Sequence, residues 1–200
     1  MFRFIHIIIC FFLFSPYVAQ ITIKDSTLQY EIQLPKNWHV SNSGLGEVTM
    51  TSPPEDVLDV FLENISVSVI PKGITLEEHN ERHIRSAYKD DVGFRGFRLL
   101  EFKLINIHGK RATINHERFH DGRKMLDIYL ATIEGDYFFY QIICASLSGR
   151  FDEHKANFNK VIRTFKINES ILNQQTVNLI AKRLGIPLIN IPKVPERPDN

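Results

Sequence analysis

The chain has 200 residues, and 24 basic against 23 acidic side chains give a formal net charge of +1 at pH 7. Proteins that bind nucleic acid or an anionic membrane surface usually carry a strong excess of basic residues, and this chain has no such excess. Nucleic acid is therefore not an expected partner. There are two cysteines, Cys10 and Cys144, and removal of a leader would leave only the second, so no intramolecular disulfide is expected.

Residues 1–20 predict a secretory signal peptide. Arg3 precedes a strongly apolar stretch at 5–14, Pro16 interrupts it, and Ala19 offers a small residue before a cleavage site. The apolar stretch is shorter than the roughly 20 residues that span a bilayer, so no stable membrane span is expected after cleavage. The sequence thus predicts a secreted or periplasmic location.

Residues 21–167 are expected to form a single α+β domain. Short runs of β-forming residues between turn signals predict strands at 27–34, 48–51 and 65–70. In the last of these, isoleucine and valine alternate with serine, which indicates a strand with one solvent-exposed face. Thr75 and Glu78 have the spacing of a capping box and predict the start of a helix.

Three glycines thirteen residues apart, Gly109, Gly122 and Gly135, organise the segment 98–146. Each lies in a short polar break between apolar runs, and glycine tolerates the positive φ of tight hairpin turns. The spacing predicts a four-stranded antiparallel meander. Its last two strands carry large apolar residues on both faces and so must be covered on both sides. We therefore expect a three-layer α/β/α sandwich around a mainly antiparallel sheet.

The remaining elements are helical or extended. Phe151, Phe158 and Ile162 fall on one face of an amphipathic helix. A further C-terminal helix is expected within 168–186, and repeated prolines predict an extended tail at 187–200.

Several short motifs occur in a distinctive order: Pro-x-x-Trp at 35–38, an alternating strand at 65–70, Thr-Leu-Glu-Glu at 75–78 and Arg-Thr-Phe-Lys at 163–166. Over roughly residues 25–167 this order resembles the PsbP-like superfamily, which includes extrinsic photosystem proteins and bacterial envelope proteins of the DcrB type. The resemblance implies an α/β/α sandwich that acts as a non-catalytic accessory or binding protein. It carries over no catalytic residues, since Pro35 and Trp38 match only as turn and packing residues.

The segment His116–His120 matches H-E-x-x-H letter for letter. Zinc hydrolases place this motif on a helix, where the two histidines share one metal and the glutamate acts as base. Here the motif runs into the Asp121–Gly122 hairpin and is predicted to be a strand. Positions i and i+4 of a strand are roughly 13 Å apart, and Glu117 would face away from both histidines. A structural role is therefore favoured over a zinc site.

The other candidates for chemistry are weaker. His79 and His83 have the spacing of a metal pair on a helix, but no third ligand is indicated beyond a conceivable Asp90 or Asp91. Cys144 lies within an apolar strand, which favours a buried side chain over a catalytic thiol.

Two clusters are interpreted as structural. The aromatic residues 137–140 are expected in the core, although one ring could line a ligand pocket. Glu55 and Asp56 lie in an expected loop and are interpreted as solvated charges.

The sequence predicts no catalytic residue, metal site or cofactor. The expected function is that of an exported, non-enzymatic accessory or binding protein of the cell envelope or extracellular space. Its expected partner is another envelope or secreted protein, and a monomer is expected. Two alternatives stay open: a zinc-dependent hydrolase built on His116 and His120 or on His79 and His83, and a small-ligand-binding domain with a pocket between sheet and helix.

Overall fold

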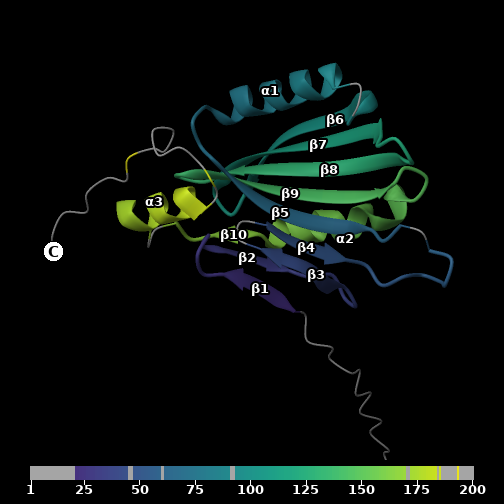
Figure 1. Ribbon diagram of the computed structural model, residues 1–200, viewed down its shortest axis with the longest axis horizontal. Helices are drawn as coiled ribbons and strands as arrows, with labels where there is room; N and C mark the ends of the chain where they lie inside the picture. Colours follow the sequence, from purple (N-terminus) through teal and green to yellow (C-terminus); the bar gives the residue numbers. More distant parts are fainter. Residues whose placement is uncertain are drawn as a thin grey trace, which may run out of the picture.

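The computed structural model describes residues 21–44, 47–59, 61–90, 93–169, 172–183, 185 and 193. Within these residues, a seven-stranded sheet, a three-stranded sheet and three helices pack together, and all strand pairs are antiparallel (Figure 1). None of the described helices has the length and apolar character needed to cross a bilayer. The predicted signal peptide and almost all of the proline-rich tail lie outside the described residues.

The larger sheet has the strand order β3-β4-β5-β9-β8-β7-β6. Its strands are β3 (His39–Gly44), β4 (Glu47–Thr51), β5 (Asn64–Pro71), β6 (Arg95–Ile107), β7 (Lys110–His120), β8 (Met125–Glu134) and β9 (Phe138–Leu147). The last four strands form the meander that the glycine spacing predicts, so this prediction is confirmed. The strand β3 was not predicted.

Glycine lies in each hairpin turn of the meander, for two different physical reasons. Gly109 and Gly122 have φ values of 84° and 96°, in the left-handed region that glycine tolerates best. Gly135 does not have a positive φ. A Cβ at that position would lie 2.7 Å from the carbonyl oxygen of Phe138 and 2.6 Å from Oε2 of Glu169. Close packing, and not backbone conformation, therefore requires glycine at position 135.

The smaller sheet consists of β1 (Thr22–Asp25), β2 (Tyr30–Gln33) and β10 (Lys166–Ile167), with β2 in the middle. The strand β2 is shorter than the predicted strand at 27–34. The reason is a turn in which the carboxylate of Asp25 accepts hydrogen bonds from the backbone N–H groups of Thr27 and Leu28, both at 2.8 Å. This turn folds β1, which was not predicted, back onto β2.

Three helices are described: α1 (Leu76–Lys89), α2 (Phe151–Thr164) and α3 (Gln174–Arg183). The predicted cap of α1 is confirmed, because the hydroxyl of Thr75 accepts a hydrogen bond from the backbone N–H of Glu78 at 3.2 Å. Helix α1 packs on β6 and β7, whereas α2 packs on β8, β9 and β2 from the other side (Figure 1). The predicted α+β sandwich with helices on both faces of an antiparallel sheet is therefore confirmed.

The main core lies on the α2 side of the larger sheet. The ring of Phe158 is fully buried there, with its centroid 6.4 Å from the ring of Trp38 and 6.0 Å from that of Phe151. Val177 and Ile180 of α3 belong to the same core. A smaller apolar cluster lies under α1; its buried members are Ala87, Phe97, Phe119, Leu126, Ile128, Leu130 and Ala145.

A buried carboxylate, Glu169, connects the segment after β10 to the β8–β9 turn. It accepts hydrogen bonds from the backbone N–H groups of Asp136 and of Tyr137, the latter at 3.3 Å. The hydroxyl of Tyr140 lies 3.2 Å from Oε1 of Glu169 and donates to the carbonyl of Leu28 at 2.8 Å. Burial raises the pKa of Glu169 above its ordinary value, against the effect of the backbone hydrogen bonds.

This raised pKa makes the contribution of Glu169 to stability depend on pH. Because the folded state binds the proton more tightly, the contribution is full below the ordinary carboxyl pKa of about 4.3 and is lost as the pH rises through the folded-state pKa. The free energy of unfolding of the wild type minus that of Glu169→Gln should therefore decrease as the pH is raised from about 4 towards neutrality. Urea denaturation across this range measures the difference, and a constant or increasing difference would contradict the prediction.

Candidate functional site

A cavity of about 260 Å³ lies beside α1 on the larger sheet. Strands β7, β8 and β9, helix α1 and the loop before β6 contribute its lining residues, which are His83, Phe94, Glu117, Phe119, Ile128, Leu130, Gln141 and Ile143. Most of this lining is apolar, with a few polar groups, which is the usual composition of a small-molecule site. The volume is below the roughly 300–1,000 Å³ of pockets for drug-sized ligands, so a smaller molecule would fit.

Glu117 is the charged group of this cavity, and its side chain is only 2% exposed. Its Oε1 accepts a hydrogen bond from Nδ2 of Asn115 at 3.0 Å and lies 2.8 Å from Nε2 of His83. Asn115 also donates to Oδ1 of Asn80 at 2.8 Å. Among the described residues, no hydrogen bond reaches the second carboxylate oxygen, Oε2. Glu117 is therefore a largely buried carboxylate whose Oε1 is bonded to protein groups, whereas its Oε2, which is not among the fully buried atoms without a partner, keeps some contact with solvent.

Two local periodicities bring this network together. Asn115, Glu117 and Phe119 alternate along β7 and so share the face that α1 covers. Asn80 and His83 are three residues apart on α1, a spacing that places both on one side of the helix. Helix α1 thus contributes Asn80 and His83, and β7 contributes Asn115 and Glu117, to a helix–sheet contact that is otherwise apolar.

His79 lies next to this network but has other partners. Its ring stacks on Phe139 with centroids 4.9 Å apart, and its Nε2 lies 3.4 Å from Nε2 of Gln141. Burial, together with the charge of His83, lowers the pKa of His79. The two histidines of the predicted helical metal pair therefore contact different groups. Asp90 follows the end of α1, where its backbone N–H donates to the carbonyl of Ser86, and Asp91 lies outside the described residues.

The H-E-x-x-H segment lies on β7, which confirms that it is a strand. Nε2 of His116 is 2.9 Å from Oδ2 of Asp127 on the α2 side, and its ring stacks on Phe151 at 4.1 Å. Glu117 points to α1 on the opposite face, as predicted. Nδ1 of His120 accepts the backbone N–H of Gly122 at 3.0 Å. The strand therefore gives the three motif residues three separate sets of partners.

Asp127 is the second buried carboxylate of the sheet, and its residue is 1% exposed. Arg118 donates to both of its oxygens, from Nε at 2.6 Å and from Nη2 at 2.9 Å. Burial opposes its ionisation, but hydrogen bonds from Arg118, His116 and Ser148 outweigh burial and hold its pKa below the ordinary value. This is a satisfied structural ion pair.

Cys144 is fully buried in the main core, as the sequence predicts. Burial strongly raises the pKa of its thiol, which disfavours the thiolate that a nucleophile or metal ligand needs. Phe138, Phe139 and Tyr140 of the aromatic cluster are also fully buried.

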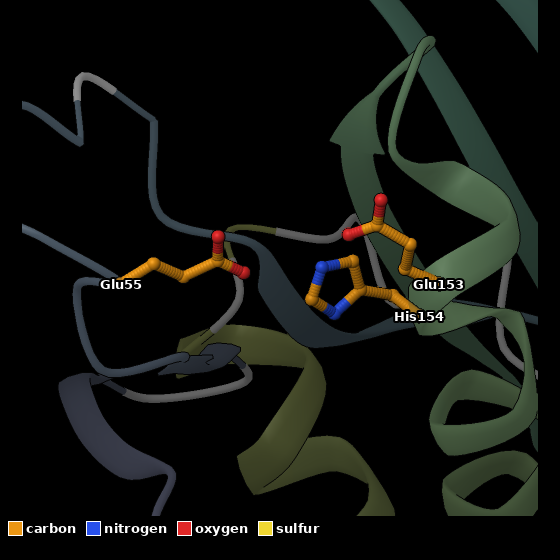
Figure 2. A group of neighbouring side chains, drawn as sticks. All are labelled: Glu55, Glu153 and His154. Carbon is orange, nitrogen blue, oxygen red and sulfur yellow. The ribbon is translucent and has the colours of Figure 1, made fainter.

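A cluster that the sequence did not predict joins the loop after β4 to the start of α2. Figure 2 shows Glu55, Glu153 and His154 converging, and each offers a ligand-type atom within 4.8 Å of the others. Arg150 pairs with Glu55 and lies 3.6 Å from Glu153 and 3.2 Å from Nε2 of His154. It also lies 3.7 Å from the fully buried Glu63. Because the guanidinium of Arg150 already contacts all three carboxylates, we interpret the cluster as an ion-pair network.

Comparison with known proteins identifies a shared fold. No family model and no curated protein sequence matches the chain. Among solved structures, PsbP from the cyanobacterium Synechocystis sp. PCC 6803 matches with a TM-score of 0.56 and 17% identity, over 77% of this chain and 96% of PsbP. LpqN of Mycobacterium tuberculosis, described as involved in cell envelope biogenesis, matches with a TM-score of 0.56 and 12% identity, over 75% of this chain and 91% of LpqN.

A third structure, PA94 of Pseudomonas aeruginosa, is described as a protein of unknown function and putative regulator. It matches with a TM-score of 0.55 and 14% identity, over 72% of this chain and 94% of PA94. At these identities the comparison establishes the fold alone. The PsbP-like fold inferred from the sequence is confirmed.

Proposed function

We propose that this chain is an exported accessory protein of the cell envelope or extracellular space, and that it binds a small molecule in the cavity beside α1 without catalysing a reaction. The observation that carries the proposal is the largely buried carboxylate of Glu117 at the wall of an apolar cavity, where no hydrogen bond from a described residue reaches its Oε2. Burying a charged group costs free energy unless its hydrogen-bonding capacity is met. A bound molecule that reaches Oε2 would meet it.

The expected location rests on the signal-like segment at 1–20. The shared fold adds support, since LpqN, which has this fold, is described as involved in cell envelope biogenesis. We further propose that another envelope or secreted protein is the partner of this chain, with the bound small molecule as the signal or cargo that the two proteins share.

A binding role fits the cavity better than catalysis does. A carboxylate paired with an imidazole, as in Glu117 and His83, orients a general base in many hydrolases. Nucleophilic catalysis of that kind also needs a hydroxyl or thiol beside the ring. The residues described as lining the cavity offer neither, since the only other polar side chain among them is the amide of Gln141.

Thermal-shift screening against envelope metabolites and signalling molecules tests the proposal. A ligand at about 100 times its Kd adds about 2.7 kcal/mol of stability, which should raise Tm by roughly 5–10 °C. The shift should disappear in Leu130→Trp, which fills the cavity, and should persist in Leu104→Trp, where the wild-type side chain is 56% exposed on β6. A ligand that binds both variants equally would place the site elsewhere and contradict the proposal.

The same preparation tests the zinc-hydrolase alternative. Metal analysis that finds stoichiometric zinc in the wild type, lost in His116→Ala and accompanied by hydrolase activity, would overturn the proposal. His120→Ala provides a second test, because both histidines would have to ligate the same ion.

A further inference from the structure

We infer that the cavity beside α1 selects a small primary ammonium ion, a compact apolar body with one protonated amine. This inference rests on the proposed function, because it names the class of ligand that the same cavity takes.

The unsatisfied atoms of the Glu117 network are acceptors. Oε2 of Glu117 accepts no hydrogen bond from the part of the chain that the structure describes. Oδ1 of Asn115, in the same network, is fully buried without a partner, but Asn115 is not one of the lining residues, so Oε2 is the acceptor that a ligand in the cavity would meet. Nδ2 of Asn115 is already engaged with Asn80 and with Oε1 of Glu117. A ligand that donates hydrogen bonds complements this end of the cavity, whereas a ligand with only acceptors does not.

The charge of the lining favours a cationic donor over a neutral one. Glu117 is the only carboxylate among the lining residues, and none of these residues is a lysine or arginine. The neighbouring His79 has a lowered pKa and so adds little positive charge at neutral pH. His83 contacts only Oε1 of the carboxylate. An ammonium group would bring a positive charge and up to three N–H donors to Oε2, the oxygen that His83 does not contact.

The rest of the wall favours an apolar body and disfavours a metal ion. Phe119 follows Glu117 on the same face of β7, and Ile128, Leu130 and Ile143 complete an apolar surface. Phe94 and Phe119 both line the cavity, and aromatic rings attract ammonium groups through their faces. A hard divalent cation would need several oxygen ligands, and the lining offers one carboxylate and one amide.

Three probes with the same apolar body separate charge from shape: 2-phenylethylamine, 2-phenylethanol and 3-phenylpropanoate. Calorimetric titration of the full chain at pH 7 is expected to show the amine binding at least tenfold more tightly than the alcohol, since a charge-assisted hydrogen bond contributes about that much. The carboxylate should bind most weakly. Glu117→Gln keeps the size of the side chain and should abolish the preference for the amine. Glu101→Gln, the same change on the outer strand β6, should retain it.

Each outcome separates the inference from the proposed function. If the wild type binds the alcohol or the acid as tightly as the amine, the ammonium inference is wrong, while binding in the cavity stands. A preference for the amine that survives in a folded Glu117→Gln also overturns it. If Glu117→Gln does not fold, the ratio of amine to alcohol affinity in the wild type decides alone. If neither the probes nor the screen yield a ligand that Leu130→Trp excludes, the proposed function itself fails.

Discussion

Replacing Phe158 by alanine is expected to lower the free energy of unfolding by about 3–5 kcal/mol. The ring is fully buried at the centre of the main core, where it packs edge-on against Trp38 at an interplanar angle of 89°. Removing it eliminates apolar burial and leaves a cavity that helix α2 and the sheet cannot fully close. Chemical denaturation of both proteins measures the loss, and Tm should fall by roughly 10 °C.

Phe102→Ala is the matched control. The same side chain is removed from β6, where Phe102 is 50% exposed on the outermost strand of the larger sheet. The free energy of unfolding is expected to change by no more than about 0.5 kcal/mol. Equal costs at the two positions would show that α2 is not held by the packing of Phe158.

Replacing Asp127 by asparagine is expected to lower the free energy of unfolding at pH 7 by about 2–4 kcal/mol. The substitution keeps the shape of the side chain but removes the charge that Arg118 contacts through two hydrogen bonds. It also removes the anionic partner of His116. Arg118 is 38% exposed, so its own loss of a partner is partly compensated by water, and most of the cost arises at the buried end of the pair.

The same pair should make the wild type sensitive to acid. The pKa of Asp127 is lowered in the folded state, so its contribution to stability is full above the ordinary carboxyl pKa of about 3.9 and is lost as the pH falls through the folded-state value. The free energy of unfolding of the wild type minus that of Asp127→Asn should therefore decrease as the pH falls. For Glu169→Gln the corresponding difference decreases as the pH rises. Glu101→Gln, which removes an exposed pair with Lys103, should cost less than about 1 kcal/mol at any pH. A wild-type advantage over Asp127→Asn that persists unchanged in acid would contradict the assignment.

The meander could be predicted because its signals are local. Turn glycines such as Gly109 and Gly122 and apolar side chains on both faces of β8 and β9 are properties of short windows of sequence. The strand β3 could not be predicted, since its residues have little β-preference and the strand depends on pairing with β4. The strand β1 depends in the same way on the turn that the Asp25 carboxylate stabilises.

The candidate site could be predicted only in part. The Asp121–Gly122 hairpin predicts a strand in which Glu117 lies on the face opposite to His116, and the cavity lies on the face of Glu117. The partner of Glu117 is His83, 34 residues away, and no spacing rule connects a helix face to a strand at that separation. The spacing of His79 and His83 directs attention to the correct helix, but only the packing of α1 on the sheet shows that His83 contacts Glu117 on β7 whereas His79 contacts β9.

The small sheet has a consequence for the order in which the chain folds. The N–H of Gln33 on β2 is bonded to the hydroxyl of Thr164 at the end of α2, across 131 residues of sequence, and β10 follows directly. A two-stranded hairpin such as β1–β2 is at best marginally stable alone. At a synthesis rate of about 5–20 residues per second, β10, the last strand of the small sheet, is made on the order of ten seconds after β2. The first strands to be made are therefore among the last to gain their native neighbours, and β2 stays open to other chains until β10 arrives.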